Sequence, residues 1–249
     1  MNALSVFGRK TRVAARLAAQ AAGVYRRDGL AASVKFGTGV ARALLRERFG
    51  SKRTKTNRLD DEFGTDTAAN AKLHGLHIDS PNYRYAVYYR ATDLPVLDAV
   101  LGALDIRHEE YTFIDYGSGK GLVLLRAAAY PFLRVVGVEF ARELHETAQR
   151  NVARYPAALR RAPIEPVHGD AVEYTPPAGN LVLYLYEPFE APVTRRVIAR
   201  IEEFRHGRDV LVAYAWARKK SLSSKPLWDA APFLRTVVEG DGWTIYRCG

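Results

Sequence analysis

Glycine at positions 117, 119 and 121, with Asp115 just before them, forms the part of this sequence best suited to binding a ligand. Glycine lets the backbone turn sharply and approach a ligand closely. A second acid, Glu139, ends the apolar stretch that begins at Val135. Because an ionised carboxylate only accepts hydrogen bonds, Glu139 could hold both hydroxyls of a ribose. The order strand, glycine-rich turn, helix and acid-tipped strand predicts a nucleotide-binding βαβ unit.

The glycine positions distinguish three nucleotide-binding motifs. The dinucleotide fingerprint G-x-G-x-x-G needs its third glycine where this chain has Leu122. The Walker A motif matches Gly119-Lys120 at its centre but fails at two of its four fixed positions. The pattern D-x-G-x-G-x-G fits at every position from Asp115 to Gly121.

That third pattern closely resembles the first motif of the Rossmann-like, class I methyltransferases that depend on S-adenosylmethionine (SAM). The general likeness covers residues 85–249, and the loop with Gly137-Val138-Glu139 is also similar to the non-SET histone lysine methyltransferases and related bacterial proteins. The resemblance to class I methyltransferases implies that SAM is the cofactor, that no metal is needed, and that the methyl group is transferred by direct in-line displacement. The acceptor is unidentified, and an amino group is one candidate. SAM carries an ammonium group and no pyrophosphate, so Asp115 could receive that ammonium directly or through water.

The resemblance also implies which residues contact the cofactor. They are Asp115, Gly117, Ser118, Gly119, Gly121, Glu139, Phe140, Asp170, Ala171 and Glu187. In the resembled family, an acid at the position of Asp170 contacts the adenine amino group, and the next backbone N–H, that of Ala171, reaches a ring nitrogen. A helix cap or turn aspartate is the alternative for Asp170.

Glu187 is the first candidate catalytic residue. Tyr186-Glu187-Pro188-Phe189 resembles the Asn/Asp-Pro-Pro-aromatic motif with which many amino-group methyltransferases of this class bind the target amine. It departs from that motif by having Glu in place of Asn or Asp and a single proline. Glu187 could orient or deprotonate a nucleophile. The alternative is a strand-end acid beside a structural Pro-Phe pair.

Tyr89 is the second candidate catalytic residue. With Arg90 and Thr92 it precedes the core, where such enzymes often place a lid over the cofactor. An aromatic ring there could attract a sulfonium by a cation–π interaction. The alternative is that the tyrosine packs against the first helix of the core. Lys120, inside the glycine loop, is expected to be a solvated charge.

Apolar runs and helical patterns alternate beyond residue 110 and predict an α/β fold, a Rossmann-like three-layer sandwich. The segment Glu239 to Gly242 predicts a hairpin, so a mostly parallel seven-stranded sheet would end in an antiparallel hairpin. Upstream, residues 61–67 are polar and turn-forming, and a helix is expected from Asp93 to Leu104. The expected strands are 112–116, 134–140, 164–169, 181–187, 209–215, 233–238 and 243–247, and the expected helices between them are 122–130, 143–155 and 193–204.

The positive charge is concentrated at the N-terminus. Residues 1–58 hold 14 lysines and arginines and two acids, which gives +12, whereas the whole chain of 249 residues carries +10. We therefore expect three parts: a basic helical arm at 1–58, a lid and helical lead-in at 59–110, and a SAM-binding core at 111–249. The arm could bind an anionic membrane surface, bind nucleic acid or an acidic partner, or cover the core as a solvated helical extension. An organellar transit peptide has a similar composition.

Composition excludes several other classes of function. A single cysteine allows no internal disulfide and no cysteine-based metal cluster, and favours a reducing compartment such as the cytoplasm. No apolar run is long enough for a transmembrane helix, so any membrane contact would be peripheral. The functional alternative to an enzyme is a non-catalytic SAM-binding scaffold whose arm binds a membrane surface or nucleic acid.

Overall fold

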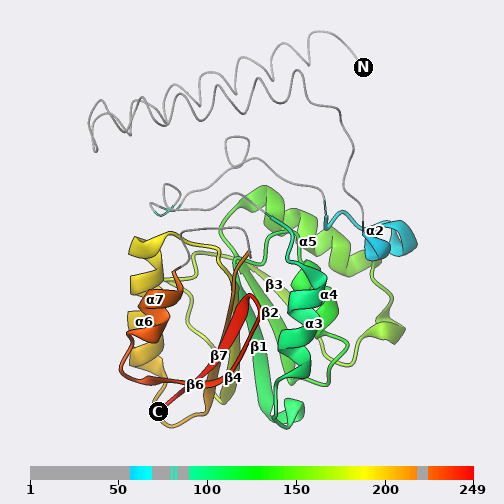
Figure 1. Ribbon diagram of the computed structural model, residues 1–249. Helices are drawn as coiled ribbons and strands as arrows, with labels where there is room; N and C mark the ends of the chain where they lie inside the picture. The colour runs from blue at the N-terminus through cyan, green and yellow to red at the C-terminus, as the bar shows by residue number, and fades with distance from the viewer. Residues whose placement is uncertain (1–56, 69–79, 81, 83–89, 218–223) are drawn as a thin grey trace, which may run out of the picture. The chain divides into compact units, whose positions relative to one another are not determined.

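A computed structural model describes residues 57–68, 80, 82, 90–217 and 224–249, and all of them belong to one compact unit. Its centre is a seven-stranded sheet with the strand order β3-β2-β1-β4-β5-β7-β6 (Figure 1). The strands are β1 Tyr111–Tyr116, β2 Arg134–Glu139, β3 Ile164–His168, β4 Asn180–Tyr186, β5 Val210–Ala215, β6 Leu234–Gly240 and β7 Trp243–Cys248. The predicted fold class, a mostly parallel sheet with an antiparallel C-terminal pair, is confirmed.

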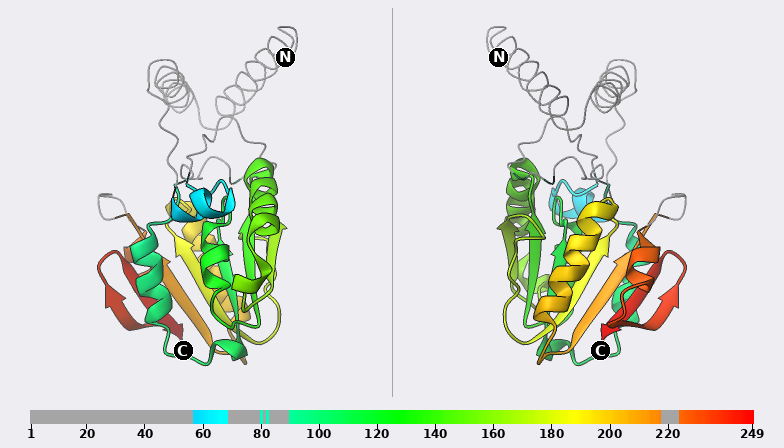
Figure 2. Two further views of the ribbon diagram at one scale, coloured as in Figure 1. Left: turned by 90° about the vertical axis from the view of Figure 1, so that its right-hand side faces the viewer. Right: turned by 90° about the vertical axis from the view of Figure 1, so that its left-hand side faces the viewer.

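Helices cover both faces of this sheet. α3, α4 and α5 lie on one face, and α6 and α7 lie on the other (Figure 2). The helices are α2 Arg58–Phe63, α3 Leu94–Gly102, α4 Leu122–Ala127, α5 Arg142–Arg154, α6 Ala191–Phe204 and α7 Lys225–Asp229. α7 was not expected from the sequence. Among the described residues, no helix has the length and apolar character needed to cross a membrane.

The central strands are mostly apolar because both of their faces are covered. All six residues of β1 and of β5 are buried. Successive side chains of a strand point to opposite faces, so Phe113 packs with α3 and α4 while Ile114 packs with α6. This arrangement explains why these strands are continuous apolar runs rather than alternating ones.

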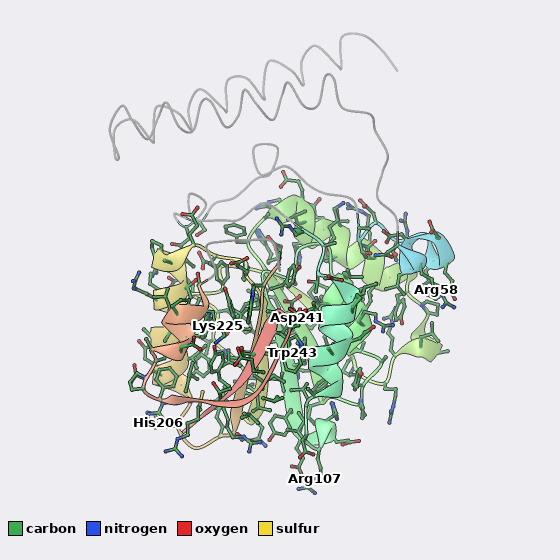
Figure 3. All side chains as sticks on the ribbon, in the orientation of Figure 1. Arg58, Arg107, His206, Lys225, Asp241 and Trp243 are labelled. Atoms are coloured by element: carbon green, nitrogen blue, oxygen red, sulfur yellow. The ribbon has the colours of Figure 1, made fainter. Side chains whose placement is uncertain are left out.

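The C-terminal hairpin is tighter than the sequence indicated. β6 continues through Gly240, so only Asp241 and Gly242 form the turn, whereas a four-residue turn was expected. Gly240 is needed because a Cβ there would stand 2.2 Å from the ring of Trp243. The turn lies beside the end of β5, since Trp243 pairs with Ala215, and Asp241 and Trp243 lie together there (Figure 3).

Residues 61–67 were expected to be a polar turn, but the segment 57–68 contains the helix α2. Asn57 caps this helix by accepting a hydrogen bond from the Asp60 N–H, and Gly64 ends it in the left-handed conformation. The buried Asp60 carboxylate then accepts hydrogen bonds from Thr65 and Thr67. These local bonds give a short polar stretch a fixed shape.

Candidate active site

The glycine loop follows β1 and is tied to the end of the neighbouring strand β2. The N–H groups of Gly117 and Ser118 both donate to the carbonyl of Val138, at 2.9 and 3.1 Å. Gly117, Gly119 and Gly121 have φ values of +84°, +54° and +85°, a region that side-chain-bearing residues rarely adopt. The loop is therefore shaped by its three glycines at the carboxyl end of the sheet, where open α/β sheets bind ligands.

Glu139 lies directly against this loop. Its carboxylate accepts hydrogen bonds from the Gly119 N–H, at 2.8 Å on Oε2, and from the Ala141 N–H, at 2.9 Å on Oε1. The residue is 4% exposed. Burial raises its pKa to about 7, although the backbone donors act in the opposite direction. Because a carboxylate offers about four lone-pair sites, these two bonds leave acceptor capacity for a ligand hydroxyl.

A second buried carboxylate lies at the base of the loop. Asp115 is 3% exposed, and burial together with the charge of Glu139 raises its pKa well above its ordinary range. In the described part of the chain, no donor bonds its carboxylate, whereas two backbone N–H groups bond that of Glu139. Asp115 and Glu139 are thus two buried carboxylates next to the glycine loop, and their charges interact.

Asp170, two residues after β3, has a structural role. Its Oδ1 accepts the Val172 N–H at 2.9 Å, as a turn aspartate would. Its Oδ2 accepts hydrogen bonds from the hydroxyl of Ser80 and from the amide of Asn82, the latter at 2.7 Å. Asn82 in turn accepts a hydrogen bond from Arg196 on α6. Among the described residues, three of the lone-pair sites are used, which leaves one on Oδ1 as an acceptor.

Ser80, Asn82 and Arg196 were not identified from the sequence. Their link to Asp170 joins residues up to 114 positions apart, so no local pattern could indicate it. Ala171 is buried beside Asp170, and Phe140 is half-buried just after Glu139.

Glu187 follows β4 in a strained conformation. Its φ is +43°, the one positive value among the non-glycine residues that the structure describes. The side chain is buried. Strained backbone of this kind is concentrated at functional sites. The pKa of the neighbouring Tyr186 is raised by burial and by the charges of Asp93 and Glu187, so the start of α3 also contributes to this end of the sheet.

The loop after β4 and the glycine loop are in direct contact. A Cβ on Gly117 would stand 2.7 Å from Cβ of Pro188. Glycine is thus needed at 117 for the close approach as well as for its φ. The sequence placed these motifs 70 positions apart, and the structure brings them together because β1 and β4 are adjacent strands.

The remaining predicted residues have different outcomes. The side chain of Ser118 is buried near Gly137, so a cofactor contact by Ser118 would use its backbone. Lys120 is not a solvated charge: it is buried and forms an ion pair with Asp66. Tyr89 and most of the arm at 1–58 lie outside the described residues.

The reversed last strand decides the fold. β1 to β5 run parallel, and β7 pairs antiparallel with β5 after a hairpin from β6. The chain has the class I methyltransferase fold. No protein-family model and no curated protein matches the sequence.

Comparison with solved structures finds many similar chains. An RNA methyltransferase from Salinibacter ruber in complex with S-adenosyl-L-homocysteine is 23% identical, with a TM-score of 0.42 over 63% of this chain and 91% of that one. The glycopeptide N-methyltransferase MtfA is 10% identical, with a TM-score of 0.47 over 61% and 94%. The mitomycin 7-O-methyltransferase MmcR is 18% identical, with a TM-score of 0.47 over 62%, and this chain spans only 52% of it. These values are too low to transfer an activity, so the function must be inferred from the site itself.

Proposed function

We propose that this protein is a SAM-dependent methyltransferase that transfers a methyl group by direct in-line displacement. The observation that carries the proposal is the buried carboxylate of Glu139, bonded to the Gly119 N–H of a D-x-G-x-G-x-G loop. This arrangement places an acceptor-only group where a ribose would lie against the loop. The bound cofactors named for two similar structures, S-adenosyl-L-homocysteine and SAM, agree with this proposal.

The charges of the site fit a cationic cofactor. Asp115 and Glu139 are both buried, and burial raises the pKa of each. The charge of Glu139 raises the pKa of Asp115 further, so the two carboxylates repel each other when both are ionised. A ligand with an ammonium and a sulfonium would relieve this repulsion. The pyrophosphate of NAD or the phosphates of ATP would add negative charge next to Asp115, which disfavours both.

When bound, SAM supplies an activated methyl group on a sulfonium cation. The chain contributes alignment, which is the main source of rate for such a displacement. Glu139 would accept hydrogen bonds from the ribose hydroxyls, Asp115 would accept the ammonium, and Asp170 with the Ala171 N–H would bind the adenine. The contact between Pro188 and Gly117 keeps the loop that carries Glu187 next to the cofactor loop.

We infer that the acceptor is an amino group and that Glu187 orients it. Glu187 is buried and held in a strained conformation beside the cofactor loop, where a carboxylate could accept a hydrogen bond from an amine and take its proton. Phe189 is half-buried in the same loop.

Binding and turnover of the full-length protein test the proposal in two steps. Calorimetry should show binding of SAM and S-adenosylhomocysteine, and tighter binding of NAD or ATP would contradict it. With radiolabelled SAM and a fractionated cell extract, label should enter an amine-bearing fraction. The Glu139→Ala variant should lose at least about tenfold in affinity, since it removes a charged hydrogen-bond partner. Cofactor binding without any turnover would identify the scaffold instead.

A further inference from the structure

The glycine loop is held from outside by a side chain of the segment 57–68. The side chain of Lys120, inside the loop, is only 8% exposed, and its Nζ lies 2.8 Å from both carboxylate oxygens of Asp66. The Asp66 side chain is 52% exposed. The lysine ammonium is therefore desolvated while its partner remains accessible to water.

Asn151 on α5 fixes the two backbones at the same place. Its Oδ1 accepts the Asp66 N–H at 2.9 Å, and its Nδ2 donates to the carbonyls of Asp66 and Lys120, at 3.1 and 2.9 Å. Asn151 is itself buried. Asp66 and Lys120 are thus joined through both their side chains and their backbones, and the ion pair has little freedom to rearrange.

Asp66 is also held from its own side. The Asp60 carboxylate accepts the N–H groups of Thr67 and Ala68, at 2.8 and 2.9 Å, which fixes the chain just after Asp66. Leu59 on α2 packs with side chains of α4 and α5. The carboxylate that faces Lys120 therefore has a defined position.

We infer that Asp66 is a positioning residue that compensates the charge of Lys120, so that the loop can accept a cationic cofactor. This inference rests on the proposed function. Lys120 lies between Gly119 and Gly121, and the Gly119 N–H bonds the acid expected to hold the ribose. A lysine charge without Asp66 would repel a sulfonium and an ammonium bound by the same loop. With Asp66 in place, the pair is neutral.

SAM and S-adenosylhomocysteine distinguish this role from a structural one. They share the ribose, adenine and amino-acid parts, but only SAM carries the sulfonium charge. A loop that merely lost its shape would bind both ligands less well by similar factors. An uncompensated Lys120 charge would weaken SAM more than S-adenosylhomocysteine. The ratio of the two dissociation constants is therefore the quantity to measure.

The test uses calorimetry on the full-length protein and three variants at low salt. In Asp66→Asn, the ratio of the SAM constant to the S-adenosylhomocysteine constant should rise about 3- to 10-fold, as expected for a charge at moderate distance. The rise should shrink as salt is added. Asp66→Asn with Lys120→Gln should restore the ratio. Asp61→Asn, an exposed acid of α2, is the matched control and should leave the ratio unchanged.

Other outcomes distinguish a failure of the proposed methyltransferase function from a failure of the role given to Asp66. If the unmodified protein binds neither ligand, the proposed function fails. If it binds both and Asp66→Asn leaves the ratio unchanged, the role of Asp66 is overturned while the function stands. If the double variant does not fold, Lys120→Gln alone decides: a ratio below that of the unmodified protein would support the inference, and an equal or higher ratio would overturn it.

Discussion

At the scale of single residues, the site is dominated by acids that are buried at a cost. The pKa of Glu139 is raised to about 7 by burial, even though two backbone N–H groups bond its carboxylate. The pKa of Asp115 is raised as well. A protein core that kept such groups only for stability would gain from replacing them. Their presence agrees with the proposed roles, in which Asp115 accepts an ammonium and Glu139 accepts ribose hydroxyls.

The raised pKa of Glu139 gives a prediction about stability without ligand. Its ordinary value is 4.5 and its folded value about 7, so the folded protein holds the proton more tightly. The tighter proton binding by Glu139 stabilises the folded protein fully below pH 4.5. This stabilisation is lost as the pH rises through 7, which lowers the free energy of unfolding by about 3 kcal/mol. The Glu139→Gln side chain does not titrate, so this variant does not lose stability in this way. Its free energy of unfolding, compared with that of the unmodified protein, should therefore rise as the pH increases from 4.5 to above 7.

Urea unfolding at several pH values measures that difference. The control is Glu165→Gln, an exposed acid on β3, whose difference from the unmodified protein should stay nearly constant. A flat difference for Glu139→Gln as well would show that the Glu139 carboxyl ionises as it does in water.

At the scale of elements, the sequence predicted the strands and helices better than the contacts between them. The glycines and Glu139 gave the first βαβ unit because their spacing is local, and apolar runs gave all seven strands to within a few residues. α2 was missed because its apolar residues are few, and its shape depends on Asp60 accepting several hydrogen bonds. Lys120 was misplaced because its partner, Asp66, lies 54 positions away.

The contact between the two site loops gives a prediction at this scale. In Gly117→Ala, the new Cβ would stand 2.7 Å from Cβ of Pro188, at a φ of +84°. Backbone strain alone should cost about 1–3 kcal/mol, and the clash should add to it. Gly207→Ala is the matched control, because Gly207 has a φ of +74° and open space around its Cβ position.

Thermal or urea unfolding of the two variants distinguishes the cost of the positive φ, which both share, from the cost of the contact with Pro188, which only Gly117→Ala makes. Gly117→Ala should lose more stability than Gly207→Ala, and the second substitution Pro188→Gly should return part of the difference. Equal losses in Gly117→Ala and Gly207→Ala would mean that the two loops are not pressed together in solution.

At the scale of the whole molecule, the charge divides the chain into two parts. Residues 1–58 carry +12, whereas the remaining residues carry a small negative net charge, since the total is +10. The boundaries proposed for the arm, lead-in and core remain predictions. Sequence could indicate the fold of the core because buried strands have a strong apolar signal, but it could not identify what the arm binds, because charge alone suits several partners.

The arm gives a third prediction, on binding to anionic surfaces. Replacing Arg9, Arg12 and Arg16 by Gln in the full chain should weaken binding to vesicles with anionic lipid on the order of 100-fold, at about 1 kcal/mol for each basic residue. SAM affinity should stay the same. The control replaces three arginines that lie outside the arm, Arg107, Arg134 and Arg195.

Co-sedimentation with vesicles and a parallel titration with nucleic acid measure this effect. A loss confined to nucleic acid would assign the arm to that partner. Unchanged binding to both would contradict a binding role and leave the arm as a helical extension of the core.

The insertion of β7 between β5 and β6 also has a consequence for synthesis of the protein. β5 is buried on both faces, yet its second neighbour is made only after β6 and the turn at Asp241. Until then β5 presents an open edge with unpaired backbone groups, a hazard for mispairing with other chains. The half of the sheet that carries the proposed acceptor loop is therefore completed late, because β7 can pair with β5 only after Cys248 has been translated.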